Sequence, residues 1–294
     1  MTKPISVYHP KAVYTWKKLR NHIGLALLNL LFVGICFVVL LPILYALSIS
    51  FNANNSILGS DFTFIPREFT LANYRSVIVD QPILLWFSNT LILAVSSVLI
   101  ALGVAIPGAY SMSRRRFRGR VALTKTLILL HSFPAILSMF AIFRVFSPLG
   151  LVNSRLGLTI IYIGTMSIFG LLNLKGYFDS IPQEIEEAAK MDGTTTRQTI
   201  QLIFLPLAKP AIVVTAIMVL IYVWNEYIFA ITFMTGRQNY TLAAGLYSLQ
   251  ATEMSGNWPI FAAASIVVSI PILIIFFASQ KYMVSGLTAG GVKG

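Results

Sequence analysis

Long apolar stretches alternate with short polar ones along this chain. Six stretches carry almost no charge, and each is long enough for one helix across a bilayer, because about 20 apolar residues span a core of about 30 Å. They cover residues 21–60, 81–113, 126–143, 156–174, 210–236 and 254–280. Backbone polar groups find no water in a membrane core, so helices are the expected form. The pattern predicts an all-α integral membrane protein with six transmembrane helices.

Prolines interrupt this pattern at several points. Pro107 lies in the second apolar stretch and Pro134 in the third. A proline removes a backbone hydrogen bond and clashes with the preceding turn, so we predict a kink or break at each. Between the first two stretches, Pro66 interrupts the chain and Thr70 is a candidate cap for a short surface helix.

Composition and charge support a multi-pass membrane protein. The 294 residues are 56% hydrophobic and 11% charged, with mean hydropathy +0.78, above the roughly 45–50% apolar content of soluble domains. The net charge of +12 does not indicate nucleic-acid binding, because 17 of the 22 Lys and Arg residues lie in alternate polar segments. The positive-inside rule makes those segments, and both termini, cytoplasmic. We expect the arginines between residues 114 and 120 to anchor this topology against anionic lipid; a specific partner contact is the alternative.

The polar interval between the fourth and fifth stretches carries the most specific pattern. Seven residues at set spacings, called the fixed positions below, make up this pattern: Glu187, Ala188, Ala189, Gly193, Ile203, Leu205 and Pro206. Ser180 followed by Gln183 resembles a capping box, and Gly193 is suited to ending a helix. A second helix fits residues 194–205 and would end at Pro206. The segment at about 179–206 is therefore predicted to form a helix-turn-helix elbow, and an ordinary connecting loop is the alternative.

The first helix of the elbow has one predicted docking face. Residues at helical spacing share that face: Ile181, Ile185, Ala188 and Ala189. The small side chains of Ala188 and Ala189 would permit close approach of a partner.

Glu226 is the only carboxylate within a predicted span. Placing it near the bilayer centre would cost at least about 2.5 kcal/mol, so we expect it to face the bundle interior. Trp224 and Asn225 beside it complete a polar and aromatic cluster of the kind that binds sugar hydroxyls and stacks on pyranose rings. The alternative is a structural bond from Glu226 to a neighbouring helix.

Patterns for catalysis and metal binding are missing from the sequence. Cys36 is the single cysteine, and no Gly-Lys dipeptide of a P-loop occurs. Neither a Ser/His/Asp constellation nor a pair of intramembrane carboxylates is present. We predict a non-enzymatic chain without a catalytic residue, metal or cofactor of its own. If ATP drives its function, another polypeptide hydrolyses it.

Four parts of the sequence together resemble one family. They are residues 64–74, the basic loop after the second span, the elbow with its Glu-Ala-Ala pattern, and the glycine-rich ending at 285–294. With these, the chain resembles carbohydrate-uptake ABC importer permeases, of the maltose and maltodextrin G-subunit type, over essentially its whole length. The resemblance implies the type I ABC importer permease fold, with a cytoplasmic segment 1–20, a six-span domain 21–284 and a cytoplasmic tail 285–294.

The resemblance implies a function and a set of partners. The chain would be a permease subunit of an ATP-driven, binding-protein-dependent importer in the bacterial inner membrane, moving oligosaccharides by alternating access. Its partners would be a second homologous permease subunit, two copies of an ABC ATPase that bind ATP and Mg, an extracytoplasmic solute-binding protein, the oligosaccharide and membrane lipid. Maltodextrins, multiple sugars and acidic oligosaccharides such as alginate fragments all fit. An ion-coupled secondary carrier and a membrane scaffold subunit are the alternatives.

The resemblance also assigns roles to residues. The seven fixed positions of the elbow would couple the chain to the ATPase, and Trp224, Asn225 and Glu226 are the candidate substrate path. An external loop at about 237–258 would face the binding protein. In the tail, Gly290, Gly291 and Lys293 are candidate ATPase contacts.

Overall fold

The computed structural model describes residues 11–53, 65–66, 68–251 and 257–291. Residues 1–10 of the predicted N-terminal segment, 252–256 of the predicted external loop, and Lys293 lie outside this part. The described residues are helical and contain no β-sheet beyond one isolated bridge between Asn52 and Phe69. The helices are α1 (Lys11–Ser50), α2 (Ala72–Val79), α3 (Ile83–Arg114), α4 (Arg120–Ser132), α5 (Ala135–Phe146), α6 (Arg155–Ser180), α7 (Gln183–Met191), α8 (Thr196–Thr199), η1 (Ile200–Phe204), α9 (Leu205–Leu207), α10 (Lys209–Asn225), α11 (Ile228–Phe233), η2 (Arg237–Asn239), α12 (Leu242–Ala251) and α13 (Trp258–Gly291).

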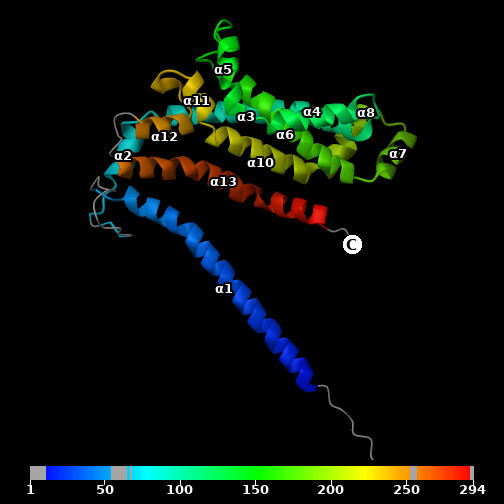
Figure 1. Cartoon of the computed structure of the whole chain (residues 1–294), viewed down its shortest axis with the longest axis horizontal. Helices are drawn as coiled ribbons and strands as arrows, with labels where there is room; N and C mark the ends of the chain where they lie inside the picture. The colour runs from blue at the N-terminus through cyan, green and yellow to red at the C-terminus, as the bar shows by residue number, and fades with distance from the viewer. Residues whose placement is uncertain (1–10, 54–64, 67, 252–256, 292–294) are drawn as a thin grey trace, which may run out of the picture.

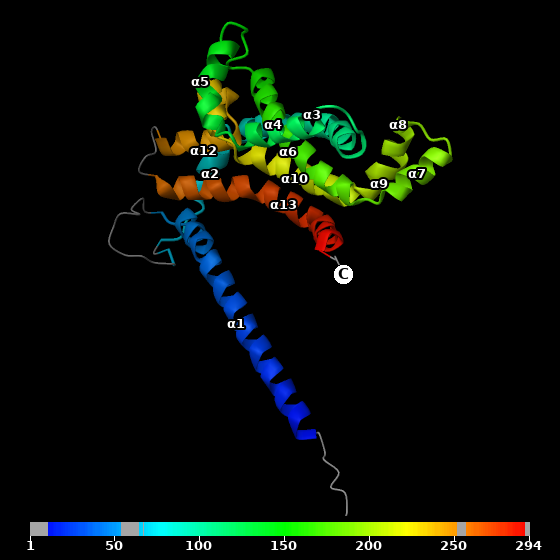
Figure 2. The same cartoon turned by 45° about the vertical axis from the view of Figure 1, so that its right-hand side comes forward.

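A bundle of long helices forms the body of the molecule. Helices α3, α6, α10 and α13 run side by side, with α7 and α8 at one end and α2 and α12 at the other (Figures 1 and 2). Helix α3 packs most extensively against α6. Helix α1 extends away from this bundle, and its side chains between residues 22 and 40 are exposed. An exposed apolar helix of this kind is expected to contact lipid or another subunit.

The number of apolar segments agrees with the sequence pattern. Helices α1, α3, α6 and α13 are each long and apolar enough to cross a membrane. Two further candidates are bent: α4 meets α5 at 92°, and the segment α8 to α9 meets α10 at 79°. Counting each bent pair as one span makes six. The predicted all-α architecture with six apolar segments is confirmed. The third segment is broken, as Pro134 predicted, and the fifth, α10, follows the segment α8 to α9 after a sharp bend.

The two intramembrane prolines behave differently. Helix α4 stops before Pro134, where Phe133 is extended with ψ 131°, the backbone that a following proline favours. Helix α3 continues through Pro107 without interruption. The predicted kink or break is confirmed at Pro134, whereas α3 has no break at Pro107.

The segment predicted as an external loop is folded against α3. Trp86 Nε1 donates to the carbonyl of Arg237 at 2.6 Å, and Asn89 Nδ2 donates to that of Tyr240 at 2.9 Å. Helix α12 follows, and a Cβ on its Gly245 would lie 2.2 Å from the Trp86 ring. Only glycine permits this approach. The described part of the segment therefore packs against the start of α3 and does more than connect two spans.

Two helix boundaries also differ from the sequence pattern. Helix α2 begins after its N-cap residue Leu71, so the cap expected at Thr70 lies one position too early. The Thr70 hydroxyl still accepts from the backbone N–H of Ala72 at 3.1 Å. Helix α13 continues to Gly291. The backbone of Gly290 and Gly291 is thus helical, where the sequence predicted a separate tail from residue 285.

Candidate functional site

The elbow predicted from the sequence is formed by α7 and by the segment from α8 to α9. Asp192 caps the C-terminus of α7, and Gly193 follows with φ of 79°. The N–H of Gly193 donates to the Lys190 carbonyl at 3.0 Å, and that of Thr194 donates to the Ala189 carbonyl at 3.1 Å. This pair of bonds needs a left-handed residue, which favours glycine. The predicted helix end at Gly193 is confirmed.

The capping box lies at the second helix of the elbow, not the first. Ser180 Oγ donates to the Tyr177 carbonyl at 2.7 Å, and α7 begins after Pro182 without a side-chain cap. Thr195 and Gln198 instead form a capping box at the start of α8. The capping box predicted at Ser180 is therefore wrong, because the Ser180 hydroxyl is bonded to a carbonyl in the last turn of α6.

The second helix of the elbow passes through the proline that was predicted to end it. The π turn η1 precedes Pro206 and is closed by a bond from the Leu205 N–H to the Ile200 carbonyl. A π turn accommodates the missing N–H and the bulk of a proline ring. The chain turns at Ala208 before α10 begins. The predicted end at Pro206 is wrong by two residues.

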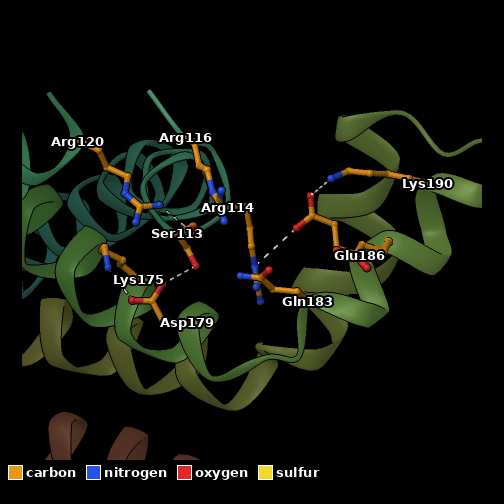
Figure 3. A pocket seen from close by; sticks show the side chains of 10 residues that line it. Ser113, Arg114, Arg116, Arg120, Lys175, Asp179, Gln183, Glu186 and Lys190 are labelled. Atoms are coloured by element: carbon orange, nitrogen blue, oxygen red, sulfur yellow. Dashed lines mark hydrogen bonds and ion pairs between the residues drawn. The ribbon is translucent and has the colours of Figure 1, made fainter. Parts of the chain in front are cut away.

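A buried carboxylate fastens α7 to the bundle (Figure 3). Glu186 Oε1 accepts from the Tyr110 hydroxyl at 2.9 Å and lies 2.7 Å from Lys190 Nζ. Its Oε2 lies 3.7 Å from Arg114 Nε, and the side chains of Arg114 and Glu186 are 4% and 7% exposed. Removing one partner from a buried ion pair leaves an uncompensated charge, which is strongly unfavourable. These contacts therefore hold α7 in one position.

Arg114 connects the end of α3 to three further elements. Its Nη2 donates to the carbonyls of Phe178 at 2.7 Å and Ile181 at 2.5 Å, both at the end of α6. Its guanidinium lies 5.1 Å from the centre of the Phe204 ring in η1, a distance at which the ring attracts a cation. Arg114 is thus an internal link rather than only a topology anchor. Sequence reasoning missed both it and Glu186; the one local signal was the four-residue spacing of Glu186 and Lys190.

The fixed positions of the elbow divide between an inner and an outer face. Ala189 is buried, whereas Ile203 and Leu205 are half-buried. The exposed positions are Glu187, Ala188, Gly193 and Pro206.

The docking face predicted for α7 is wrong in part. The four residues do not share one face, because Ile181 and Ala189 are buried within this chain, whereas Ala188 is exposed and Ile185 is 37% exposed. The reason is that α7 docks through Glu186 and Ala189, which are three residues apart, so its neighbouring apolar positions face outward. The exposed Ile185 and Ala188 lie three residues apart, so they form an apolar patch beside the exposed carboxylates of Glu184 and Glu187.

The second candidate cluster is not brought together as the sequence suggested. Trp224 is buried and donates from Nε1 to the Val268 carbonyl at 3.3 Å in α13, so it does not line an open path. Asn225 is exposed and donates from Nδ2 to the Ile221 carbonyl of its own helix at 2.8 Å. A cavity of about 380 Å³ beside them is lined by Asn225, Glu226 and mainly apolar neighbours.

Glu226 stands at a break between helices rather than inside one. Helix α10 ends before it and α11 begins after it. Its Oε1 accepts from the N–H of Phe229 at 2.8 Å, and its Oε2 accepts from the N–H of Ala230 at 3.2 Å. The Tyr162 hydroxyl of α6 donates to Oε2 at 2.7 Å. Glu226 therefore caps α11 and joins it to α6, which agrees with the structural alternative.

We expect Glu226→Ala to destabilise the region around this break. The substitution removes the acceptor of two backbone N–H groups and of the Tyr162 hydroxyl, which should lower the free energy of unfolding by about 1–3 kcal/mol. Glu226→Gln keeps an acceptor oxygen and should lose less. Thermal unfolding of the purified chain measures both. Asn225→Ala is the control, because the Asn225 amide bonds only within its own helix; an equal loss there would contradict the capping role.

The attachment of the elbow should weaken at acid pH. Burial tends to raise the pKa of Glu186, but hydrogen bonds from Lys190 and Tyr110, with the charges of Lys190 and Arg114, lower this pKa below its ordinary 4.5. A group with a lowered folded-state pKa contributes stability above its unfolded pKa and loses it as the pH falls through the folded value. The melting temperature should therefore fall below about pH 4.5 more steeply for the wild type than for Glu186→Gln. Parallel pH profiles of the two proteins would contradict this.

Comparisons with known proteins identify the family. The sequence profile described as "Binding-protein-dependent transport system inner membrane component" matches residues 97–288. The chain is 32% identical over 280 residues to the galactooligosaccharides transport system permease protein GanQ of Bacillus subtilis, covering 94% of this chain and 98% of that protein. It is 31% identical over 291 residues to the maltose/maltodextrin transport system permease protein MalG of Yersinia pestis, covering 92% and 94%.

A solved structure shows the same fold. It is a bacterial ABC transporter involved in the import of the acidic polysaccharide alginate, and one of its chains superimposes with a TM-score of 0.74 at 25% identity, covering 95% of this chain and 99% of that one. The resemblance to sugar-transport permeases noted in the sequence is confirmed. The chain belongs to the family of binding-protein-dependent transport system inner membrane components, the permease subunits of ABC importers.

Proposed function

We propose that this chain is the permease subunit of an ATP-driven importer that receives an oligosaccharide from an extracytoplasmic solute-binding protein and releases it into the cytoplasm. The relatives named above transport galactooligosaccharides and maltodextrins, and the similar solved structure imports alginate. All of these solutes are carbohydrates, although they differ in charge and linkage. They support an oligosaccharide as the substrate class rather than one particular sugar.

The observation that carries this proposal is the attachment of α7. A coupling element must follow the membrane helices as a rigid body and must offer a surface that a partner can approach closely. The buried contacts of Glu186 supply the first property, and the exposed Ala188 supplies the second. We assign coupling to the motif as a whole, Glu187, Ala188, Ala189, Gly193, Ile203, Leu205 and Pro206, with the buried and half-buried members acting through the shape of the elbow.

The partners follow from this assignment. ATP and Mg bind in two copies of an ABC ATPase, and this chain, whose sequence carries no Gly-Lys dipeptide of a P-loop, transmits their closure to the membrane helices. A second homologous permease subunit completes the translocation path. The elbow and both termini lie on the cytoplasmic side, which the distribution of Lys and Arg supports. We also propose that Gly290 and Gly291, at the end of α13, contact the ATPases, as the resemblance implies.

The solute contacts that we propose for this chain lie beside the break after α10. Asn225 is exposed there, and Glu226 and Tyr222 line the same cavity of about 380 Å³. An amide, a carboxylate and a phenol match the hydrogen-bonding needs of sugar hydroxyls. Trp224 supports this wall from behind, because its indole is buried against α13.

Reconstitution tests the proposed function. The chain is assembled with its partner subunits in proteoliposomes, and the solute-binding protein is supplied with a panel of neutral and acidic oligosaccharides. We expect uptake that requires both internal ATP and the binding protein and that withstands ionophores. Uptake that survives removal of ATP but collapses with an ionophore would instead identify an ion-coupled carrier.

A further inference from the structure

A cationic cavity of about 490 Å³ lies where the elbow joins the bundle (Figure 3). Its walls come from the ends of α3 and α6, from the start of α4 and from α7. Three acidic side chains line it, against five basic ones: Arg114, Arg116, Arg120, Lys175 and Lys190. The cavity therefore holds a surplus of positive charge at the level where two membrane helices end.

Most of the charge on the elbow side and the α6 side of this cavity is already compensated. Lys175 lies 2.6 Å from Asp179, and Lys190 lies 2.7 Å from Glu186. Arg116 makes no hydrogen bond or ion pair within the described residues. The Nη1 of Arg120 makes only long contacts, 3.3 and 3.4 Å, to backbone carbonyls. Two guanidinium groups are thus left to bind an anion.

A second cavity adjoins the first and shares Arg116 and Arg120 with it. It also has a volume of about 490 Å³, and its remaining walls are Phe117, Arg118, Gly119, Val121 and Ala122. Phe117 is 43% exposed and Val121 is 64% exposed. The two arginines are therefore shared by a polar, cationic space and a mainly apolar one, to which Arg118 adds one further positive charge. A free phosphate ion would fill only the polar space. A phospholipid could fill both, because its charged phosphate is followed by apolar acyl chains.

We propose that these adjoining cavities bind one anionic phospholipid. Arg116 and Arg120 hold its phosphate in the manner typical of guanidinium groups, and Phe117 and Val121 contact its glycerol and first acyl carbons. Anionic lipids concentrate on the cytoplasmic leaflet, where basic segments next to membrane helices attract them. Because α7 forms one wall of the cationic cavity, the bound lipid would contact the coupling elbow and the ends of α3 and α6 together.

Lipid retention by the assembled importer tests this proposal without depending on transport. The complex containing the full chain is purified in neutral detergent, supplied with phosphatidylglycerol and phosphatidylcholine in equal amounts, and its bound lipids are measured by native mass spectrometry. We expect a preference for phosphatidylglycerol, reduced about fivefold by Arg116→Gln and further by Arg116→Gln with Arg120→Gln. The control is Lys125→Gln with Arg197→Gln, which removes two exposed cations outside both cavities and should leave the preference unchanged.

The remaining outcomes separate a lipid from other anions. Equal retention of both lipids by the wild type overturns the proposal, as does an equal loss in the Arg116/Arg120 and the control variants. A third arm adds inorganic phosphate at the concentration of the phosphatidylglycerol. Displacement of the lipid by phosphate at that concentration would identify a site for a free anion and would also overturn the proposal. The Arg116→Gln variant keeps the test valid if the double variant fails to fold, because Arg116 has no hydrogen bond or ion pair to lose within the described residues.

Discussion

Glu186→Ala should detach α7 from the bundle and lower the free energy of unfolding by about 3–5 kcal/mol. The substitution leaves the Arg114 guanidinium, whose side chain is 4% exposed, without its carboxylate, and it removes the acceptor of the Tyr110 hydroxyl. A detached α7 cannot transmit motion, so stimulation of ATP hydrolysis by the loaded binding protein should also be lost. Chemical unfolding in detergent and ATPase assays of the assembled importer measure the two effects.

Two further variants show whether burial of Glu186 is the cause. Glu184→Ala removes an exposed carboxylate from the same helix and should stay within about 0.5 kcal/mol of the wild type. Arg114→Met combined with Glu186→Met leaves no buried charge unpaired, because the remaining partner, Lys190, has a 54% exposed side chain. The double variant should cost less than the two single changes together. Similar losses for Glu184→Ala and Glu186→Ala would mean that the ion pair does not hold the elbow.

Ala188→Asp should uncouple the permease while leaving its own stability unchanged. Ala188 is exposed, so the new carboxylate meets water in the isolated chain. In a closely packed contact with a partner the carboxylate would lose that water without gaining a counter-charge. We expect binding-protein-stimulated ATP hydrolysis to fall about tenfold or more, since each 1.4 kcal/mol of lost affinity is tenfold. The assembled importer in proteoliposomes is the required sample, with thermal unfolding measured in parallel.

Ala188→Ser is the matched control because serine is small and uncharged, and it should keep most of the stimulation. Gly193→Val should act like Ala188→Asp by another route, since a β-branched residue is strained at φ of 79°. If Ala188→Asp leaves the stimulated hydrolysis unchanged, the elbow only connects α6 to α10, and the coupling proposal is lost.

The membrane class, the six apolar segments and the elbow were predictable from the sequence because their signals are local. The length of an apolar stretch decides whether it can cross a membrane. A glycine after a short amphipathic helix marks a helix end wherever that helix docks, and Gly193 has the expected left-handed backbone. The spacing of the elbow residues is specific enough to indicate the family from the sequence alone.

The tertiary structure decided which of these residues face inward. Glu186 and Glu187 are adjacent glutamates, yet only Glu186 is buried. Its burial depends on the hydrogen bond from Tyr110, which lies 76 residues away in the chain, so the local sequence could not distinguish the two. In the same way, the indole of Trp224 donates to a carbonyl of α13, and the carboxylate of Glu226 accepts from a tyrosine of α6. Helical spacing shows which side chains share a face, but the direction of that face depends on contacts between distant segments. Such contacts form only when the whole bundle has assembled.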